Sequence, residues 1–100
     1  MRKVTLSKRA SVKLEKLLVY LENEWTEKVK HDFIKILDKN FDRIITYPKS
    51  NEKSALKKGL YRCVVTRQTT LFYQFDASSI KVVALFDTRM DPRKIKQEVR

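Results

Sequence analysis

Apolar runs divide the second half of the chain into three expected β-strands. Residues 60–65 are apolar, β-branched and aromatic around Arg62, residues 69–75 alternate between two faces, and residues 80–86 are almost wholly apolar. Short runs of this kind between polar breaks are typical of strands. The breaks have three and four residues, which permits hairpins and excludes the long crossover that parallel strands need. The pattern therefore predicts an antiparallel meander.

Apolar residues recur every three or four positions along the first half of the chain, which is the spacing of one face of an α-helix. One stripe begins after Ser7 and a second begins after Thr26, two residues that are suited to helix N-caps. Two helices joined so closely are expected to be antiparallel neighbours, a helical hairpin. The first stripe consists of Ala10, Leu14, Leu17, Leu18, Leu21 and Trp25, and the second of Val29, Phe33, Ile36, Leu37, Phe41, Ile44 and Ile45.

Each helical stripe must be buried, and the meander offers the opposing apolar face. Residues 4–6 form a short apolar piece that would serve as an edge strand, and Pro48 ends the second helix because the residue before proline avoids helical geometry. Gly59, the only glycine, is placed for a turn into the meander. We therefore predict a single domain over residues 1–100, of the α+β class, in which an N-terminal strand and a helical hairpin form a layer on an antiparallel sheet.

Composition adds a strong positive charge and argues against several classes of protein. The chain has 23 Lys and Arg against 12 Asp and Glu, and the excess is concentrated in residues 48–75 and 89–100. Such a field favours a polyanion, namely RNA, DNA or an acidic protein, and solubility alone is the plain alternative. No apolar run has the roughly 20 residues of a membrane span, and the N-terminus lacks the apolar segment of a signal peptide. Because Cys63 is the only cysteine, we expect a cytoplasmic protein without an internal disulfide.

Metal and cofactor chemistry find little support in the residue types. The chain has one cysteine and one histidine, so we predict no metal site and no cofactor. His31 falls off the helical stripe, and we interpret it as a surface residue. The tail has two interpretations: Asp91 and Pro92 would begin a short helix over residues 93–99, or the tail is disordered.

Three short motifs in the meander are shared with a known family. Tyr61-Arg62 is similar to the family's Tyr-Arg/Lys-X-Val strand, and LFYQF at residues 71–75 is similar to its tyrosine-bearing central strand. The best match is VVALFDTRMDP at residues 82–92, an apolar strand followed by Asp-Thr-Arg-X-X-Pro. With the order strand, helix, helix and meander in a basic chain, these motifs resemble the RelE/ParE superfamily of bacterial toxins. The resemblance covers essentially the whole chain.

This resemblance implies the toxin of a type II toxin–antitoxin pair. Its partner would be an antitoxin from the adjoining gene, which we expect to be acidic and amphipathic and to wrap over the helical hairpin and the sheet. RelE-like members enter the ribosome and cleave the bound mRNA, whereas ParE-like members inhibit DNA gyrase and cleave nothing themselves. A basic nucleic-acid-binding module without toxicity is a third hypothesis from the charge alone.

Metal-independent cleavage of RNA needs a group that takes the 2′ proton, cations that stabilise the phosphorane and an acid for the leaving oxygen. The resemblance assigns the cationic role to Arg62 and Arg89, whose guanidiniums would bind one phosphate together. The alternatives are that Arg62 is an exposed strand residue and that Arg89 forms a salt bridge or anchors a loop. Flanking nucleic acid would be bound by Lys57, Lys58, Arg67, Arg93 and Lys94.

Two departures from the ribonuclease pattern oppose catalysis. Thr70 stands where those members usually carry an arginine, and the chain after Arg89 has neither the tyrosine nor the histidine that transfers protons there. A guanidinium, with a pKa above about 12, is a poor proton shuttle. The arginine pair favours mRNA cleavage and the missing proton-transfer residue opposes it, so this hypothesis leads gyrase inhibition only slightly.

Overall fold

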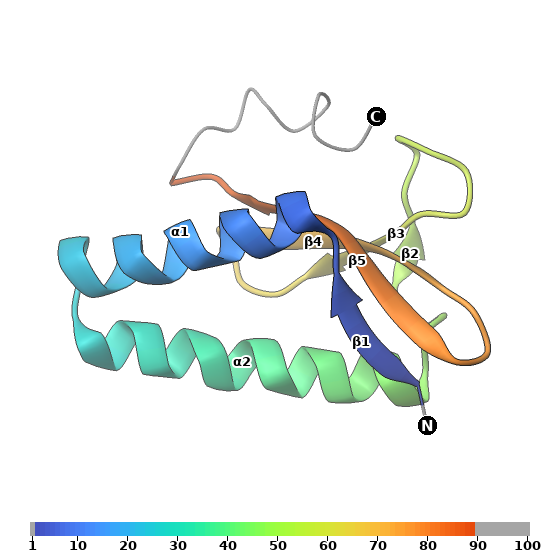
Figure 1. The fold of residues 1–100 in the computed structure, drawn as a ribbon, viewed down its shortest axis with the longest axis horizontal. Coiled ribbons are helices and arrows are strands. Elements are labelled where there is room, and N and C mark those ends of the chain that lie inside the picture. The colour runs from blue at the N-terminus through green and yellow to red at the C-terminus, as the bar shows by residue number, and fades with distance from the viewer. Residues whose placement is uncertain (1, 90–100) are drawn as a thin grey trace.

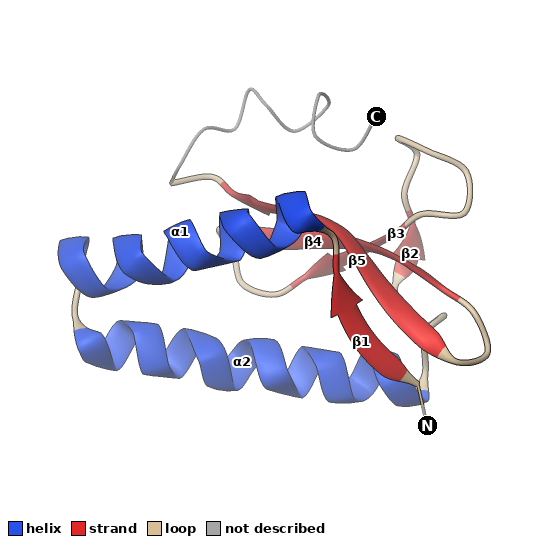
Figure 2. Ribbon diagram, in the orientation of Figure 1, coloured by secondary structure: helices blue, strands red, loops and turns tan. Residues whose placement is uncertain are grey.

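Two helices cover one side of a five-stranded sheet in the computed structural model, which describes residues 2–89 (Figure 1). The helices lie together in one layer and the strands in another, as the colours of Figure 2 show. This arrangement confirms the predicted two-layer α+β fold. The elements in chain order are β1 (Lys3–Leu6), α1 (Lys8–Glu24), α2 (Glu27–Thr46), β2 (Glu52–Lys53), β3 (Tyr61–Val64), β4 (Thr69–Phe75) and β5 (Ser79–Asp87).

Both helices begin at the predicted N-caps. The hydroxyl of Ser7 accepts a hydrogen bond from the backbone N–H of Ala10 at 3.0 Å, and that of Thr26 accepts one from Val29 at 3.0 Å. Each bond satisfies an N–H group that the first turn of a helix leaves without a backbone partner. Because Trp25 ends α1 and Thr26 caps α2, the two helices run back along each other (Figure 1). The helical hairpin is confirmed.

The sheet has the strand order β1-β5-β4-β3-β2, and β3, β4 and β5 form the predicted antiparallel meander. The prediction of a wholly antiparallel sheet is wrong at one edge, because β1 pairs in parallel with β5, from Lys3 opposite Ser79 to Leu6 opposite Val82. The helical hairpin follows β1 and lies outside the sheet, so the long connection that a parallel pair needs is present. At the other edge is β2, which consists of two exposed polar residues.

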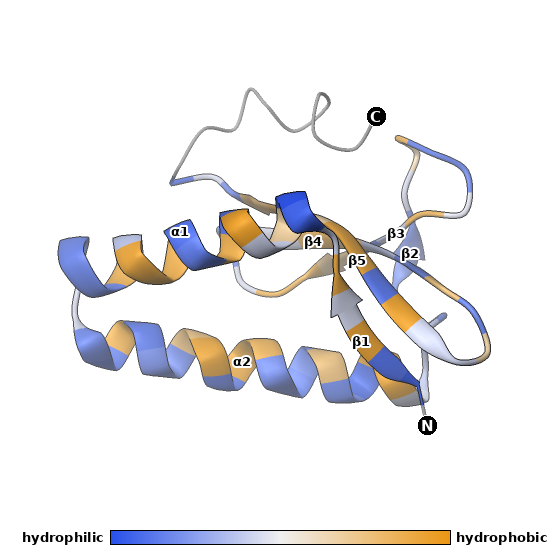
Figure 3. Cartoon of the chain, viewed as in Figure 1, coloured by the Kyte–Doolittle hydropathy of each residue, from blue (hydrophilic) through white to orange (hydrophobic). Residues whose placement is uncertain are grey.

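The main core lies between the helices and the sheet. Along both helices, orange apolar bands alternate with blue polar ones in Figure 3, as expected for helices that bury one face. Two members of the predicted stripes are nevertheless wrong, because Trp25 is 57% exposed and Ile36 is 40% exposed. Trp25 is the C-cap of α1 and follows its last regular turn. The buried members of the stripes are Ala10, Leu17, Leu21, Phe33, Leu37 and Ile44.

The face of the sheet away from the main core is also apolar in part. Phe72 is 1% exposed and forms a second buried cluster with Leu60 and Ala84. The cluster is positioned by an irregularity between β4 and β5, where Phe72 pairs with Ala84 and Tyr73 pairs with Val82. A bulge of this kind increases the local twist of a strand pair. The alternation predicted for β4 is therefore correct, and its outer face is less polar than an open binding platform would be.

Hydrogen bonds attach the segment after α2 to the sheet. The hydroxyl of Tyr73 donates to the backbone carbonyl of Pro48 at 2.6 Å and accepts a bond from Asn51 at 3.1 Å. Gly59 has a φ of 80°, a left-handed conformation that favours glycine, so the turn predicted there is confirmed. No helix within residues 2–89 is long and apolar enough to cross a membrane. The possible helix over residues 93–99 lies outside the described residues.

Candidate functional site

Arg62 lies on the outer face of the sheet. Residues of β3 alternate between buried and exposed, and Tyr61 and Cys63 belong to the main core. Arg62 therefore points to the other side, where its neighbours across the sheet are Phe72 of β4 and then Ala84 of β5. Its guanidinium pairs with Glu52 of β2, with 3.1 Å between Nη1 and Oε1, and its side chain is 45% exposed. The ion pair leaves this arginine accessible from solvent.

Arg89 is bound to a buried carboxylate. Its Nε and Nη2 donate to the two carboxylate oxygens of Asp87 at 2.8 and 2.7 Å, and its backbone N–H donates at 2.9 Å. Asp87 is 1% exposed and accepts a further bond of 2.6 Å from the hydroxyl of Thr69. Such a two-point pair fixes the orientation of the guanidinium plane. The side chain of Arg89 is 20% exposed, so it serves as an anchor for the end of β5.

Opposing effects determine the proton affinity of this buried pair. Burial alone would raise the pKa of Asp87, but hydrogen bonds from Arg89 and Thr69 outweigh it and hold that pKa below its ordinary value. The same hydrogen bond with Asp87 raises the pKa of Arg89. Both groups are therefore charged at neutral pH, and the guanidinium has no role in moving protons.

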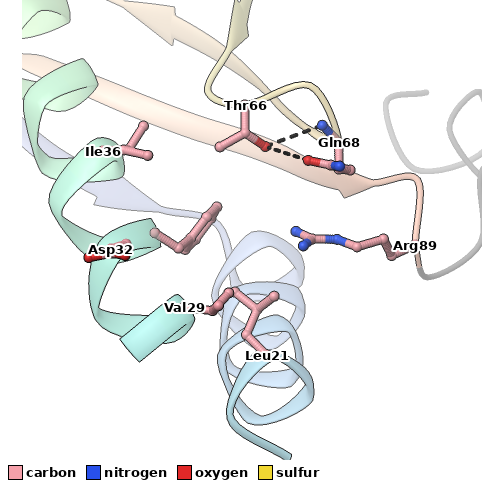
Figure 4. A pocket seen from close by; sticks show the side chains of 8 residues that line it. Leu21, Val29, Asp32, Ile36, Thr66, Gln68 and Arg89 are labelled. Carbon is pink, nitrogen blue, oxygen red and sulfur yellow. Dashed lines mark hydrogen bonds between the residues drawn. The ribbon is translucent and has the colours of Figure 1, made fainter. Parts of the chain in front are cut away.

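The side chain of Arg89 reaches the helical side of the sheet. Thr69, opposite Asp87, shares its face of β4 with Leu71 and Tyr73 of the main core. Figure 4 shows the guanidinium of Arg89 extending into a pocket of about 190 Å³ at the helix side of the β3–β4 turn. We name this hollow the hairpin pocket, and its lining residues are Leu21, Val29, Asp32, Phe33, Ile36, Thr66, Gln68 and Arg89.

The structure does not bring Arg62 and Arg89 together. Arg62 lies on the outer face of the sheet, and Arg89 lies on the helical face in contact with the hairpin pocket. The expectation that both guanidiniums bind one phosphate is therefore not supported by this geometry. The alternative interpretations, an exposed strand residue for Arg62 and a salt bridge for Arg89, describe what is observed.

The other predicted site residues are dispersed. Lys57 and Lys58 are exposed in the segment before β3, and Arg67 is exposed in the turn that follows β3, so these cations lie at opposite ends of the strand. Arg93 and Lys94 lie outside the described residues. Thr70 is half-buried on the outer face, opposite Val64 and Phe86.

Other candidate chemistry among residues 2–89 is sparse. His31 has a side chain that is 63% exposed and lies 3.8 Å from Glu27, which confirms it as a surface residue. Cys63 is buried, and burial raises the pKa of its thiol against the opposing effect of Arg43, so it is a poor nucleophile. No three His, Cys, Asp or Glu side chains of the described part of the chain are grouped as metal ligands require.

A comparison with known protein families identifies the family of this chain. The family described as the ParE toxin of the type II toxin-antitoxin system parDE matches residues 4–92. The chain belongs to the ParE toxin family. This ParE toxin is also similar to a chain of the chromosomal ParDE system from P. aeruginosa, with a TM-score of 0.71 and 7% identity over 87% of this chain and 96% of that one.

A second solved structure supports the same fold for the ParE toxin. YafQ from E. coli strain BL21(DE3) has a TM-score of 0.57 and 11% identity over 89% of this chain and 96% of that one. At such identities the likeness shows the fold alone. A comparison with curated proteins finds no match. The family and the fold together confirm the predicted membership of the RelE/ParE superfamily.

Sequence reasoning missed the two carboxylates that hold the arginines. Asp87 lies within the Asp-Thr-Arg motif, but neither Asp87 nor Glu52 was assigned a role from the sequence. The spacing Asp-X-Arg after an apolar strand was an available signal for Asp87, because a carboxylate buried at a strand end requires a cationic partner nearby. No comparable signal marked Glu52, since its pairing with Arg62 depends on the short strand β2.

Proposed function

We propose that this toxin inhibits DNA gyrase by binding it and performs no chemistry of its own. The matching family is that of ParE toxins, and the RelE/ParE resemblance implies gyrase as the target of ParE-like members. The toxin would be neutralised by an antitoxin, which the type II family implies. Cleavage of mRNA, which the sequence favoured slightly, is the competing function.

The observation that carries this proposal is the separation of the two arginines. A metal-independent ribonuclease needs cations and a proton-transfer group around one phosphate. Here Arg89 is bound to Asp87 on the helical face, and Arg62 is on the outer face. Tyr61 and Tyr73 are 8% and 0% exposed, and the chain after Arg89 has no tyrosine or histidine. A binding mechanism requires none of these groups to converge.

Two assays on one purified preparation separate the functions. With gyrase and a relaxed plasmid, the toxin is expected to inhibit supercoiling in proportion to its concentration. In a purified translation reaction, it is expected to leave the ends of the mRNA unchanged. The control is the same toxin saturated with its antitoxin, which should restore supercoiling. New mRNA ends at the ribosomal A site together with full supercoiling would overturn the proposal, and a chain that inhibits neither process would point to a simple nucleic-acid-binding module.

The predicted nucleic-acid contacts enter this mechanism as a second proposal. Lys57 and Lys58 are exposed on the segment before β3, where they would bind phosphates of DNA that gyrase holds. Replacing both with alanine is expected to weaken binding to a short DNA duplex and to reduce the slope of log K against log salt by about 2. Fluorescence anisotropy at several salt concentrations measures both quantities.

The matched control for this variant removes two exposed lysines of α2, Lys35 and Lys39. Both double variants lower the net charge equally, so a general field effect would weaken DNA binding equally in the two. A contact at Lys57 and Lys58 predicts the larger loss for their variant alone. Equal losses would show that only the total charge of the chain matters.

A further inference from the structure

A second hollow lies where three distant parts of the chain meet. The start of β1, the end of α2 and the β4–β5 turn are at the same end of the molecule (Figure 1). Arg2 joins them, because its Nε donates to the backbone carbonyl of Asp76 at 2.8 Å and its Nη1 donates to that of Ile45 at 3.2 Å. The hollow has a volume of about 580 Å³. We name it the turn pocket, and its lining includes Arg2, Tyr47, Pro48, Lys49 and Phe75.

A proline turn presents an aromatic ring at the turn pocket. Tyr47 is the C-cap of α2, since the residue before proline avoids helical geometry. The N–H of Ser50 donates to the carbonyl of Tyr47 at 3.0 Å, which closes a turn with Pro48 at its second position, where proline is favoured. The hydroxyl of the buried Tyr73 donates to the carbonyl of Pro48 and holds this turn on the core. The backbone of Tyr47 is therefore fixed, while its side chain stays in solvent and is 66% exposed.

The cations of the turn pocket have donors left for a ligand. A guanidinium has five N–H groups, and Arg2 uses two of them for the two carbonyls. Lys49 is exposed, and within residues 2–89 its ammonium has no hydrogen-bond or ion-pair partner. The lining of the pocket contains no acidic residue. The turn pocket therefore offers positive charge beside an exposed ring, and an anionic ligand with a flat apolar group complements it.

Nucleic acid in single-stranded form has both of these properties. A base that is free of a duplex can stack on an aromatic ring, and cations next to the ring hold the phosphates of the backbone. Stacking on one ring contributes enough to be measured when the ring is removed, and it does not depend on the base sequence. The ring of Phe75, which lies 5.7 Å from the guanidinium carbon of Arg2, supplies part of the apolar floor.

We propose that the turn pocket binds a single strand of nucleic acid, with one base stacked on Tyr47 and the adjacent phosphates on Arg2 and Lys49. The buried Pro48 and the half-buried Phe75 lie under the base. This activity goes beyond gyrase inhibition and does not depend on it. It also uses residues other than Lys57 and Lys58, for which contacts with a duplex are proposed above.

The position of the pocket at a helix end selects a strand over a free nucleoside triphosphate. The C-terminus of α2 carries a partial negative charge, which Arg2 offsets in part through its bond to Ile45. A compact cluster of phosphates is better bound at a helix N-terminus. A strand has one charge for each nucleotide, spread along a chain of net charge +11, and gains attraction that a single nucleotide lacks. In a duplex the bases stack on each other, so they cannot reach Tyr47.

Replacing Tyr47 with alanine tests the stacking. Binding of a short fluorescent oligodeoxythymidine to the purified toxin is followed by anisotropy, and Y47A is expected to raise Kd at least about fivefold. Trp25→Ala is the matched control, because Trp25 is also an exposed aromatic residue and lies at the opposite end of α2 from Tyr47. W25A is expected to bind within about twofold of the unchanged toxin, and so is Y47F, which keeps the ring. For a duplex, Y47A should leave Kd unchanged.

Replacing Lys49 with glutamine tests the phosphate contact. K49Q is expected to reduce the slope of log K against log salt by about 0.7, the value for one phosphate of a single strand. Lys16→Gln is its matched control, because Lys16 is an exposed lysine of α1, does not line the turn pocket and loses the same charge. That control should leave the slope unchanged. The urea midpoint of each variant checks that it is folded.

Several outcomes would overturn the proposal. Unchanged Kd values for Y47A and K49Q would show that the strand binds elsewhere, and equal losses for Y47A and W25A would show that no one ring is specific. Displacement of the strand by deoxythymidine monophosphate at the same concentration of nucleotide units would assign the pocket to a free nucleotide. A toxin that self-associates until Tyr47 is replaced, with strand binding unaffected, would assign it to a second copy. The assay contains no gyrase, so a failure of gyrase inhibition would not affect this result.

Discussion

Replacing Asp87 with alanine is expected to lower the free energy of unfolding by about 3 kcal/mol. The variant removes the acceptor of both guanidinium bonds of Arg89 and of the hydroxyl bond of Thr69. A partly buried cation and a buried hydroxyl are then left without partners, which costs more than the pair itself contributes. The value lies at the lower end of the range for buried pairs because Arg89 is 20% exposed. Urea unfolding monitored by circular dichroism measures it.

The exposed arginine pair of the same sheet is the control for this variant. Arg62 and Glu52 are 45% and 75% exposed, so Glu52→Ala is expected to cost at most about 0.5 kcal/mol. Similar losses of unfolding free energy in D87A and E52A would contradict the view that burial makes the Asp87 pair important for stability. The comparison of the two variants also tests whether Arg89 anchors the end of β5 or serves only in binding. Only an anchoring role predicts that D87A lowers the free energy of unfolding.

The contribution of Asp87 to the free energy of unfolding should decrease as the pH falls. Its pKa in the folded chain lies below the ordinary value of 3.8, so the charged form is stabilised by folding. That contribution is complete above the unfolded pKa and is lost as the pH falls through the folded pKa. The difference in unfolding free energy between the unchanged toxin and D87A is therefore expected to be full at about pH 6 and to shrink below about pH 4. A difference that grows on acidification would contradict this assignment.

Replacing Phe72 with alanine is expected to destabilise the fold by about 3–5 kcal/mol, the range for large buried aromatic side chains. Phe72 is 1% exposed and lies with Leu60 and Ala84 on the face of the sheet opposite the main core. The truncation would leave a cavity, because the surrounding residues can relax only partly into the vacated space. Urea unfolding with an unchanged slope in denaturant would confirm that stability, and not the unfolded state, had changed.

Val64→Ala provides the comparison on the same face. Val64 is in β3 and is 51% exposed, so its truncation is expected to change stability by at most about 0.5 kcal/mol. A small effect of F72A, comparable with that of V64A, would mean that the outer face is an open surface. That face would then be available for binding nucleic acid.

Local signals were sufficient to predict the elements and their order. Ser7 and Thr26 marked the two helix starts because a side-chain oxygen before an apolar stripe satisfies free N–H groups. The three- and four-residue breaks of the meander specified antiparallel pairing because no crossover fits in them. Nothing comparable specified the direction of β1, whose partner is far away in the sequence. Its parallel pairing with β5 is seen only in the assembled sheet.

The direction of Arg89 could not be read from the sequence for a related reason. Residues 80–86 are almost wholly apolar, and residues 84–87 at the end of β5 are all buried, so this end of the strand lacks the alternation that tells one face from the other. The predicted burial of Trp25 and Ile36 was wrong for a different reason. Helical periodicity gives the angle of a side chain around the axis. It does not say where the helix ends, as at Trp25, or how wide the buried face is, as at Ile36 beside the buried Leu37.

The parallel pairing of Lys3–Leu6 with Ser79–Val82 has a consequence for the order in which the molecule forms during synthesis. The helical hairpin depends on contacts between neighbours in the sequence, which form quickly, whereas β1 must wait for a strand close to the other end. On the ribosome, β1 is thus made before the strand with which it pairs. The nascent chain therefore lacks its complete sheet until β5 has been synthesised.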